Sequence, residues 1–277
     1  MKNFPRFPLF LLIALFFGAF LPGGKAFSFQ TSTDWRESPC FQMLSRDVPQ
    51  LWGERLEGIC SRFETEEKLL ALTLDACGGS TPESPGFGYD EQIIRLLRKY
   101  HIPATLFISG RWASKHPELT KELSADPLFE IGNHGLNHRP ASVSGRSAYG
   151  IPGTASLEEL LEEIGTNGLL LEQFTGEKTR FYRSGTAYYD DVAVRAAACL
   201  GYAIGGYSVL GDAGATFSAV QVEKALLQSR KGDILLCHFN HPEGETAEGL
   251  EAALPELLER GFRFIRLSEI PPENRRP

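Results

Sequence analysis

The chain has 277 residues, of which 42% are hydrophobic and 23% charged, and its formal charge is -7 at pH 7. These values lie near the averages of globular proteins, so they exclude a disordered chain, a collagen-like chain and a multi-span membrane protein. The acidic balance, without any basic block, argues against nucleic acid as a partner. The five cysteines are an odd number, which is typical of an exported protein with disulfides and a spare thiol.

Residues 1–26 are predicted to be a secretory signal peptide. Lys2 and Arg6 precede an apolar run over residues 9–21, and Gly24 and Ala26 then supply the small residues of a cleavage site. The run is too short for a comfortable membrane span, although an uncleaved anchor is an alternative interpretation. We therefore expect an exported protein, periplasmic or extracellular, with no transmembrane span after signal cleavage.

The mature chain is predicted to start with an extension over residues 27–67, which includes a short helix around residues 51–60. Over residues 68–277, short apolar segments alternate with amphipathic ones. The predicted strands cover residues 69–74, 104–109, 129–133, 181–183, 202–209, 233–238 and 262–267. The predicted helices cover residues 90–100, 112–124, 156–174 (with a possible interruption at 165–168), 190–200, 218–229 and 247–260.

This alternation predicts parallel βαβ units in a single α/β domain. A barrel fits better than an open sheet, because no Gly-rich dinucleotide loop follows any strand. Residues 139–155 lack periodicity and are rich in Ser, Gly and Pro, so they form a long loop of the kind that tends to be functional.

Polar residues gather where the predicted strands end. They are Asp75, Asn133 with His134, Arg183, Asp212 and His238. In α/β barrels the carboxyl ends of the strands form the catalytic face. This placement is the first indication of an enzyme.

His134 and His138 have a spacing at which one helical turn would place both imidazoles on the same side, as a divalent metal requires. An isolated pair of this kind is more often a pair of hydrogen-bonded turn histidines. Four of the six histidines nevertheless fall in two strand-end segments, which favours a metal site. A catalytic zinc needs a third protein ligand, and Asp75 is the obvious candidate.

His238 and Arg183 have both structural and functional interpretations. His238 ends an apolar strand, so it either caps the core or points into the barrel mouth. Arg183 either forms a surface ion pair or orients a carboxylate or an anionic substrate group. The segments alone leave these alternatives open.

Five segments occur in the order of a known set of motifs, and a sixth closes the fold. They are ALTLDACGG (71–79), EIGNHGLNH (130–138), TRFYRSG (179–185), YSVLGDAG (207–214), DILLCH (233–238) and FRFIRLSEI (262–270). Taken together, they resemble the motifs of the polysaccharide deacetylases of the NodB-homology type, carbohydrate esterase family four. The chain resembles a divergent member of this family from about residue 69 to 270.

The resemblance implies a distorted (β/α)₇ barrel and metal-dependent removal of acetyl groups from an N- or O-acetylated polysaccharide or envelope glycan. It implies that His134 and His138 bind a divalent metal, expected to be Zn²⁺ with Co²⁺ or Ni²⁺ as alternatives. Asp75 then matches the catalytic base, His238 the general acid, and Arg183 the arginine that orients the aspartate. We further expect Asn133, Tyr182 and Asp212 to bind the substrate.

The first motif departs from the family, which has two consecutive aspartates where this chain has Asp75 and Ala76. Alanine cannot bind a metal, so three alternatives arise. Asp75 could itself be the metal ligand, which is the interpretation we favour from sequence. Cys77 could supply a thiolate, since it shares strand parity with Asp75. The site could also be weak or empty.

The third and fourth motifs depart as well. Serine replaces the usual proline after Arg183, and the fourth motif lacks its tryptophan, for which Phe217 could stand in. The binding groove is therefore rebuilt, and the glycan, the acyl group and the oligomeric state are not determined by the sequence. The competing hypotheses are a non-catalytic glycan-binding barrel and a hydrolase of another amide or imide bond.

The cysteines separate into groups. Cys40 and Cys60 both lie in the extension and are expected to form a disulfide. Cys199 falls on an apolar helix and is expected to be buried. Cys77 and Cys237 lie next to the candidate catalytic positions 75 and 238.

Overall fold

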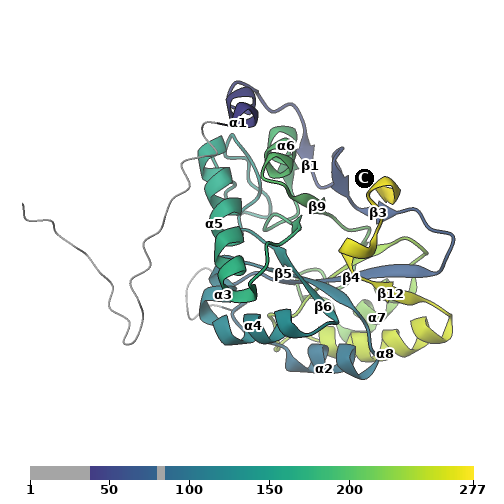
Figure 1. The fold of residues 1–277 in the computed structure, drawn as a ribbon. Coiled ribbons are helices and arrows are strands. Elements are labelled where there is room, and N and C mark those ends of the chain that lie inside the picture. The colour runs from purple at the N-terminus through teal and green to yellow at the C-terminus, as the bar shows by residue number, and fades with distance from the viewer. Residues whose placement is uncertain (1–37, 80–84) are drawn as a thin grey trace, which may run out of the picture.

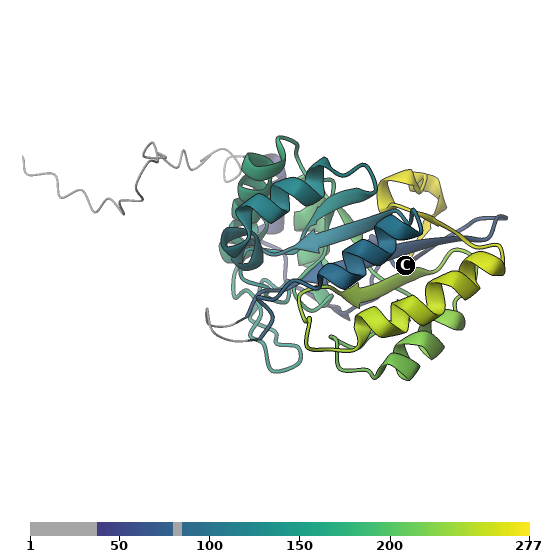
Figure 2. The ribbon, with the colours of Figure 1, turned by 90° about the horizontal axis from the view of Figure 1, so that it is seen from below.

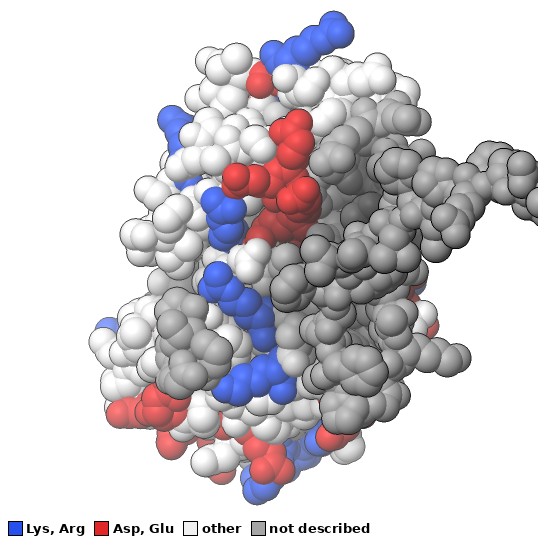
Figure 3. Space-filling model, turned by 90° about the vertical axis from the view of Figure 1, so that its left-hand side faces the viewer, with Lys and Arg blue, Asp and Glu red and all other residues white. Residues whose placement is uncertain are grey.

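The computed structural model describes residues 38–79 and 85–277. The predicted signal peptide, residues 1–26, and the first part of the predicted extension, residues 27–37, lie outside these residues. In the part of the chain that is described, no helix is both long enough and apolar enough to cross a membrane. On the face shown in Figure 3, acidic and basic side chains lie in adjacent groups.

The centre of the fold is a curved parallel sheet (Figure 1). Its path runs through β10 (Val209–Leu210), β11 (Ile234–His238), β4 (Leu69–Ala76), β5 (Ala104–Ile108), β6 (Phe129–Asn133), β7 (Phe181–Tyr182), β9 (Ala203–Gly205) and β2 (Ile59–Cys60), and β12 (Arg263–Ile265) pairs with β4. All five residues of β5 are buried, as expected for a strand covered on both faces. The sheet confirms the predicted distorted (β/α) barrel, open between β10 and β2 in the described residues.

Helices cover the outside of this sheet (Figure 2). They are α2 (Glu91–Lys99), α3 (Gly110–Lys115), α4 (Pro117–Ala125), α5 (Leu157–Thr175), α6 (Asp191–Cys199), α7 (Ala219–Leu227) and α8 (Thr246–Glu259). Most begin at a side-chain cap, because the first N–H groups of a helix have no partner inside it. Asp90, Ser109, Ser156, Asp190 and Ser218 supply these caps.

Short elements complete the chain. They are α1 (Pro39–Leu44), β1 (Trp52–Gly53), β3 (Arg62–Phe63), β8 (Tyr189–Asp190), the 3₁₀ turns η1 (Leu267–Glu269) and η2 (Pro272–Asn274), and β13 (Arg275–Arg276). β1 pairs with β8, and β13 pairs with β3, both antiparallel. The start and the end of the described chain are therefore fastened to the barrel by strand pairing.

Three predictions about elements were wrong. Residues 51–60 do not form a helix, because β1 and β2 use their backbone groups to pair with β8 and β9. The strand predicted over 202–209 splits into β9 and β10, with Gly206 packed against Ile59 and the carbonyl of Cys60. The helix α5 runs without interruption through Gly165 and Gly168.

The disulfide also differs from the prediction. Cys40 is bonded to Cys199, across 159 residues of sequence, and not to Cys60. Cys60 lies in β2 and is buried as a free thiol among Phe63, Phe181 and other apolar side chains. Cys199 is at the exposed end of α6, so the prediction that it is buried was wrong as well. The bond joins the segment before the barrel to the outer surface of α6.

Candidate active site

Four strands of the sheet deliver polar side chains to one end of the barrel. Asp75 lies near the end of β4, directly beside His238 at the end of β11 in the strand register. His134 follows β6 and Arg183 follows β7, and the last residue of β6 pairs with the last residue of β7. These placements confirm the expectation that the strand ends gather polar groups at one face.

Arg183 and Asp75 form a buried ion pair. Arg183 Nη1 donates to Asp75 Oδ1 at 2.7 Å and to Thr73 Oγ1 at 3.0 Å. The rest of the guanidinium donates to the carbonyls of Gly205 and Gly206 at 2.9 and 2.8 Å. Every edge of the guanidinium is thereby engaged, so Arg183 is fixed inside the barrel and not at the surface.

The ion pair controls the charge of Asp75. Burial by itself would raise the pKa of this carboxyl, but the positive charge and the hydrogen bond of Arg183, aided by His238, outweigh it. The pKa of Asp75 is therefore held below its ordinary value, and the group is ionised at neutral pH.

His134 is oriented by the same arginine residue. Its Nδ1 lies 3.0 Å from the carbonyl oxygen of Arg183, which can only accept, so Nδ1 carries the proton. Burial lowers the pKa of His134, which favours the neutral ring. The lone pair of Nε2 is therefore available to the groups beside it, Asp75 Oδ2 at 3.4 Å and Cys77 Sγ at 3.7 Å.

The segment between the two histidines is a turn and not the helical turn expected from their spacing. Gly135 and His138 have positive φ angles of 77° and 56°. Asn133 Oδ1 accepts from the Gly135 N–H at 2.9 Å, and Glu163 Oε1 accepts from the Asn137 N–H at 2.8 Å. These contacts shape the turn, and the two imidazole rings still meet with their centroids 4.9 Å apart.

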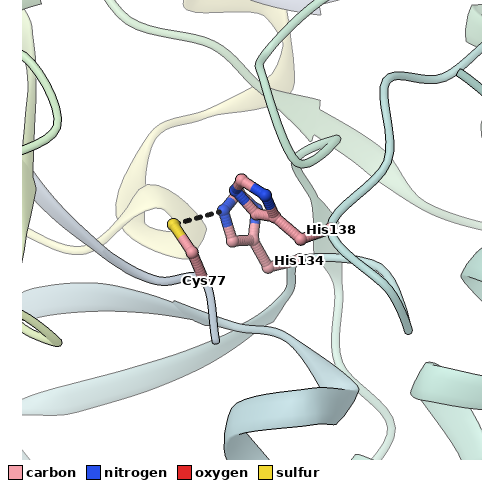
Figure 4. A group of neighbouring side chains, drawn as sticks. All are labelled: Cys77, His134 and His138. Atoms are coloured by element: carbon pink, nitrogen blue, oxygen red, sulfur yellow. Dashed lines mark hydrogen bonds between the residues drawn. The ribbon is translucent and has the colours of Figure 1, made fainter. Parts of the chain in front are cut away.

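Cys77 completes a group of three possible ligands with these histidines (Figure 4). One ligand atom each from Cys77, His134 and His138 lies within 4.8 Å of the others. Cys77 Sγ is 3.7 Å from His134 Nε2. A thiolate and an imidazole on one tetrahedral zinc are about 3.6 Å apart, so this spacing fits a metal.

The thiol chemistry of Cys77 agrees with that fit. Burial would raise its pKa, but His138 and His238 together lower the pKa to about 7. The thiolate, which is the form that binds metals, is thus accessible at neutral pH. Asp75 is not a member of the group, and Ala76 points into the apolar core.

His238 is paired with Asp212. Nδ1 of His238 lies 2.8 Å from Asp212 Oδ1, and the His238 N–H donates to Asp212 Oδ2 at 2.6 Å. Burial would lower the pKa of His238, but the charge and the hydrogen bond of Asp212 overcome it and raise the pKa well above the ordinary value. His238 is therefore held in its protonated form.

Three residues expected to bind the substrate have other positions. Asp212 is fully buried behind His238, which it orients, and its second oxygen also accepts from Thr246. Tyr182 is fully buried in the core under α5 and α6, because strand alternation sends it to the face opposite Arg183. Asn133 is also fully buried and serves the turn after β6. Asn133, Tyr182 and Asp212 thus lie behind the site and do not line it.

Comparison with known proteins agrees with this geometry. The family model described as polysaccharide deacetylase matches residues 62–205. The chain belongs to the polysaccharide deacetylase family. It is 30% identical over 209 residues to a peptidoglycan-N-acetylglucosamine deacetylase of Bacillus cereus, a match that covers 74% of this chain and 88% of the relative. It is 21% identical over 234 residues to the peptidoglycan-N-acetylmuramic acid deacetylase PdaA of Bacillus subtilis, covering 79% of each.

Solved structures share the fold of this family member. PdaA of Bacillus subtilis, a family 4 carbohydrate esterase, superimposes with a TM-score of 0.63 at 18% identity, covering 80% of this chain and 96% of that one. A CE4 family pseudoenzyme from Bacillus anthracis has a TM-score of 0.63 at 21% identity, covering 76% of this chain and 68% of that one. The chain is a divergent NodB-homology member of carbohydrate esterase family four.

One residue that supports the candidate site of this deacetylase family member was not identified from the sequence. Glu163 lies on α5 between the buried residues Leu160 and Ile164, and its carboxylate accepts from the turn that carries His138. A carboxylate on the apolar stripe of a helix is the signal that could have found it, because a buried charge needs partners.

Proposed function

We propose that this protein is an exported, metal-dependent deacetylase that removes acetyl groups from an N- or O-acetylated polysaccharide or envelope glycan. The observation that carries the proposal is the meeting of three groups at one end of the barrel. They are the Asp75–Arg183 pair, the His238–Asp212 pair, and the possible ligands Cys77, His134 and His138. Membership of the deacetylase family supports the reaction class.

Cys77, His134 and His138 are the residues proposed to hold the metal. Two imidazole nitrogens and one thiolate suit Zn²⁺, with Co²⁺ or Ni²⁺ as alternatives. When bound, such an ion lowers the pKa of water and polarises a carbonyl group. We prefer Cys77 over Asp75 as the third ligand, because the ligand atoms of Cys77, His134 and His138 all lie within 4.8 Å of one another and Asp75 is not in that group. The assignment of Asp75 as a ligand remains the alternative that experiment must exclude.

Asp75 is proposed as the general base. Its Oδ2 faces His134, while its Oδ1 is held by Arg183. The carboxylate is therefore ionised and fixed in direction, and Oδ2 is the oxygen able to take a proton from an attacking water. Arg183 is a positioning residue, because all of its contacts are made inside the protein.

His238 is proposed as the general acid. An amine is a poor leaving group until it is protonated, so the reaction needs a proton donor on the side of the leaving atom. Asp212 holds Nδ1, which leaves Nε2–H of the protonated ring as the donor. The side chain of His238 is 12% exposed, so it can be reached from the barrel mouth.

Export is proposed from the amino-terminal sequence, with its basic residues, apolar run and small-residue cleavage site. An envelope or extracellular glycan would be available to a protein in that location. The barrel would then act outside the cytoplasm.

Acetate release tests the proposed function. Purified protein loaded with Zn²⁺ or Co²⁺ is incubated with peptidoglycan, with N-acetylglucosamine oligosaccharides and with acetylated xylan, and free acetate is measured. We expect acetate from at least one of them, and a loss of at least a hundredfold in kcat for His238→Ala and Asp75→Asn. No acetate from any substrate with either metal would contradict the proposal.

A second candidate is a glycan-binding barrel without catalysis. Ala76 favours it, since the usual second aspartate is absent, and a solved structure with this fold is described as a pseudoenzyme. Glycan binding that is unchanged in His134→Ala and His238→Ala, together with no turnover in any variant, would support this candidate. A hydrolase of another amide or imide would instead be recognised by its products.

A further inference from the structure

We propose that an aromatic cluster formed by Trp52, Tyr149 and Tyr188 is a glycan-binding platform beside the catalytic face. The cluster unites three segments that are far apart in sequence. Tyr188 lies with its ring centroid 5.6 Å from that of Trp52 and 5.6 Å from that of Tyr149. The proposal rests on the proposed function, because it takes the glycan substrate as the ligand.

The cluster is joined to the site by the turn that follows Arg183. In this turn, Gly185 packs against the backbone of His138 so closely that no Cβ would fit. The Gly185 N–H donates to the carbonyl of Arg139 at 3.1 Å, and the carbonyl of Tyr188 accepts from Ala141 at 3.0 Å. Tyr188 is thus carried on the same turn as Arg183, next to a candidate metal ligand.

Tyr149 is the member of the cluster that gives the strongest support for a binding role. It is 73% exposed, although it is a large aromatic residue. It sits at the tip of a two-residue hairpin turn, in which Ala148 and Ile151 exchange both backbone hydrogen bonds. Its φ is 52°, and that of Gly150 is 76°. Turns of this kind favour Asn-Gly, and a bulky residue with positive φ is strained, so folding alone does not account for a tyrosine here.

Polar groups border the aromatic rings. Glu54 accepts hydrogen bonds from Tyr149 at 3.2 Å and from Tyr207 at 2.9 Å. The exposed guanidinium of Arg146 lies 5.7 Å from the centroid of Trp52. Aromatic faces with a few polar groups at their edge match the two parts of a sugar ring, which are its apolar C–H face and its hydroxyl and acetamido groups.

The position of the cluster explains which part of the glycan it would bind. The catalytic groups are proposed to act on one acetyl group. The cluster lies beside them, on the loop 139–155, on β1 and on the residue before β8. It is therefore proposed to hold sugar units next to the one that reacts. Long chains should gain affinity from it, and a single unit should not.

Binding measurements on two variants test the platform. Tyr149→Asn removes the ring but suits the turn, and Tyr149→Phe is the matched control that keeps the ring and loses only the hydroxyl. Affinity for the disaccharide and hexasaccharide of β-1,4-linked N-acetylglucosamine is measured by calorimetry. We expect Tyr149→Asn to weaken hexasaccharide binding by about fivefold or more, and disaccharide binding by much less. Tyr149→Phe should stay within about twofold of wild type.

A fluorescence measurement supports the test without altering the loop. With Trp35 replaced by Phe in both proteins, hexasaccharide should shift the tryptophan emission, and Trp52→Phe should remove the shift, since the remaining Trp112 is fully buried. Equal hexasaccharide affinity in wild type and Tyr149→Asn would overturn the platform, as would an equal loss in Tyr149→Phe. Ring-dependent binding without acetate release would contradict the proposed function alone, and acetate release with ring-independent binding would contradict the platform alone.

Discussion

At the scale of single residues, the pKa values of the two candidate proton-transfer groups are shifted in opposite directions. Arg183 beside Asp75 holds the pKa of that carboxyl down against burial, and Asp212 beside His238 holds the pKa of that imidazole up against burial. A base that is ionised and an acid that is protonated at the same pH are what deacetylation requires. The structure thus supports the two proposed roles through the partner of each group.

The Asp212–His238 pair gives a direct prediction. Asp212→Asn keeps the shape of the side chain but removes the charge that stabilises protonated His238. We expect kcat to fall by about a hundredfold or more, with a smaller change in KM, because Asp212 does not reach the barrel mouth. The steady-state rate of acetate release measures this. An unchanged kcat would contradict the role given to Asp212.

Glu163 gives a prediction about pH. Burial raises the pKa of Glu163, against its hydrogen bonds from Asn137 and Arg139, so the folded state binds this proton more tightly than the unfolded state does. The contribution of Glu163 to stability is then present at low pH and is lost as pH rises through the folded-state pKa. We expect the free energy of unfolding of wild type to fall, relative to Glu163→Gln, as pH rises from about 4.5 to 7.

Urea unfolding of both proteins at a series of pH values measures this difference. Glu118→Gln, at an exposed position on α4, controls for the general effect of removing one acidic group. A rise in the free energy of unfolding of wild type relative to Glu163→Gln, as pH rises from about 4.5 to 7, would contradict the effect assigned to burial.

The sequence was sufficient to place Asp75, His134, Arg183 and His238 at the strand ends, because apolar strands end where polar residues begin. It was not sufficient to show which face of the sheet each adjacent side chain occupies. Tyr182 and Arg183 are adjacent, yet one faces the helices and the other faces the barrel interior. Asp212 was correctly placed near the site, but its partner comes from another strand and could not be read from the sequence.

At the scale of elements, the long periodic segments were predicted well and the short ones were not. The apolar stripes of α2 and α5 and the buried runs of β4, β5 and β11 contain enough residues to define a period. β1 and β2 have two residues each, so only their partners define them. The same holds for the division between β9 and β10, where Gly205 and Gly206 turn their carbonyls toward Arg183.

Two glycines in α5 form a matched pair for experiment. A Cβ at Gly165 would meet nothing within 4 Å, whereas a Cβ at Gly168 would clash with the hydroxyl of Tyr202. Gly165→Ala should therefore raise the free energy of unfolding by about 0.5–1 kcal/mol, since alanine is the better helix former. Gly168→Ala should lower it by about 1–3 kcal/mol, since a well-packed site resists added volume.

Chemical denaturation of the two variants beside wild type tests this pair. Tyr202 also contacts Asn133, which supports the turn that carries His134 and His138. Equal effects of the two substitutions would contradict the packing seen at Gly168.

The disulfide between Cys40 and Cys199 gives a further prediction at this scale. It closes a long loop, and cross-links of long loops restrict the unfolded chain most. Reduction should lower the free energy of unfolding by about 2–5 kcal/mol. A Cys40→Ala/Cys199→Ala variant should be insensitive to reductant, and peptide mapping of the oxidised protein should recover the Cys40–Cys199 pair. A recovered Cys40–Cys60 pair would contradict the structure.

At the scale of the whole molecule, residues 38–61 are integrated into the barrel. They supply β2 at the edge of the sheet, the disulfide to α6, and Trp52 of the aromatic cluster. The alternation of strands and helices was enough to predict the parallel barrel, because βαβ units allow few arrangements. It could not reveal that an early strand, β2, forms the far edge of the sheet, because two residues are too few to show a period.

The central claim is that Cys77 replaces the missing acidic ligand in a metal site with His134 and His138. X-ray absorption at the zinc edge of the purified, zinc-loaded protein tests it most directly. We expect one sulfur at about 2.3 Å with nitrogen or oxygen ligands at about 2.0–2.1 Å, and we expect Cys77→Ala to lose the sulfur and most of the bound zinc. A zinc coordinated only by nitrogen and oxygen in the wild type, and bound equally well by Cys77→Ala, would contradict the claim and return the third ligand to Asp75.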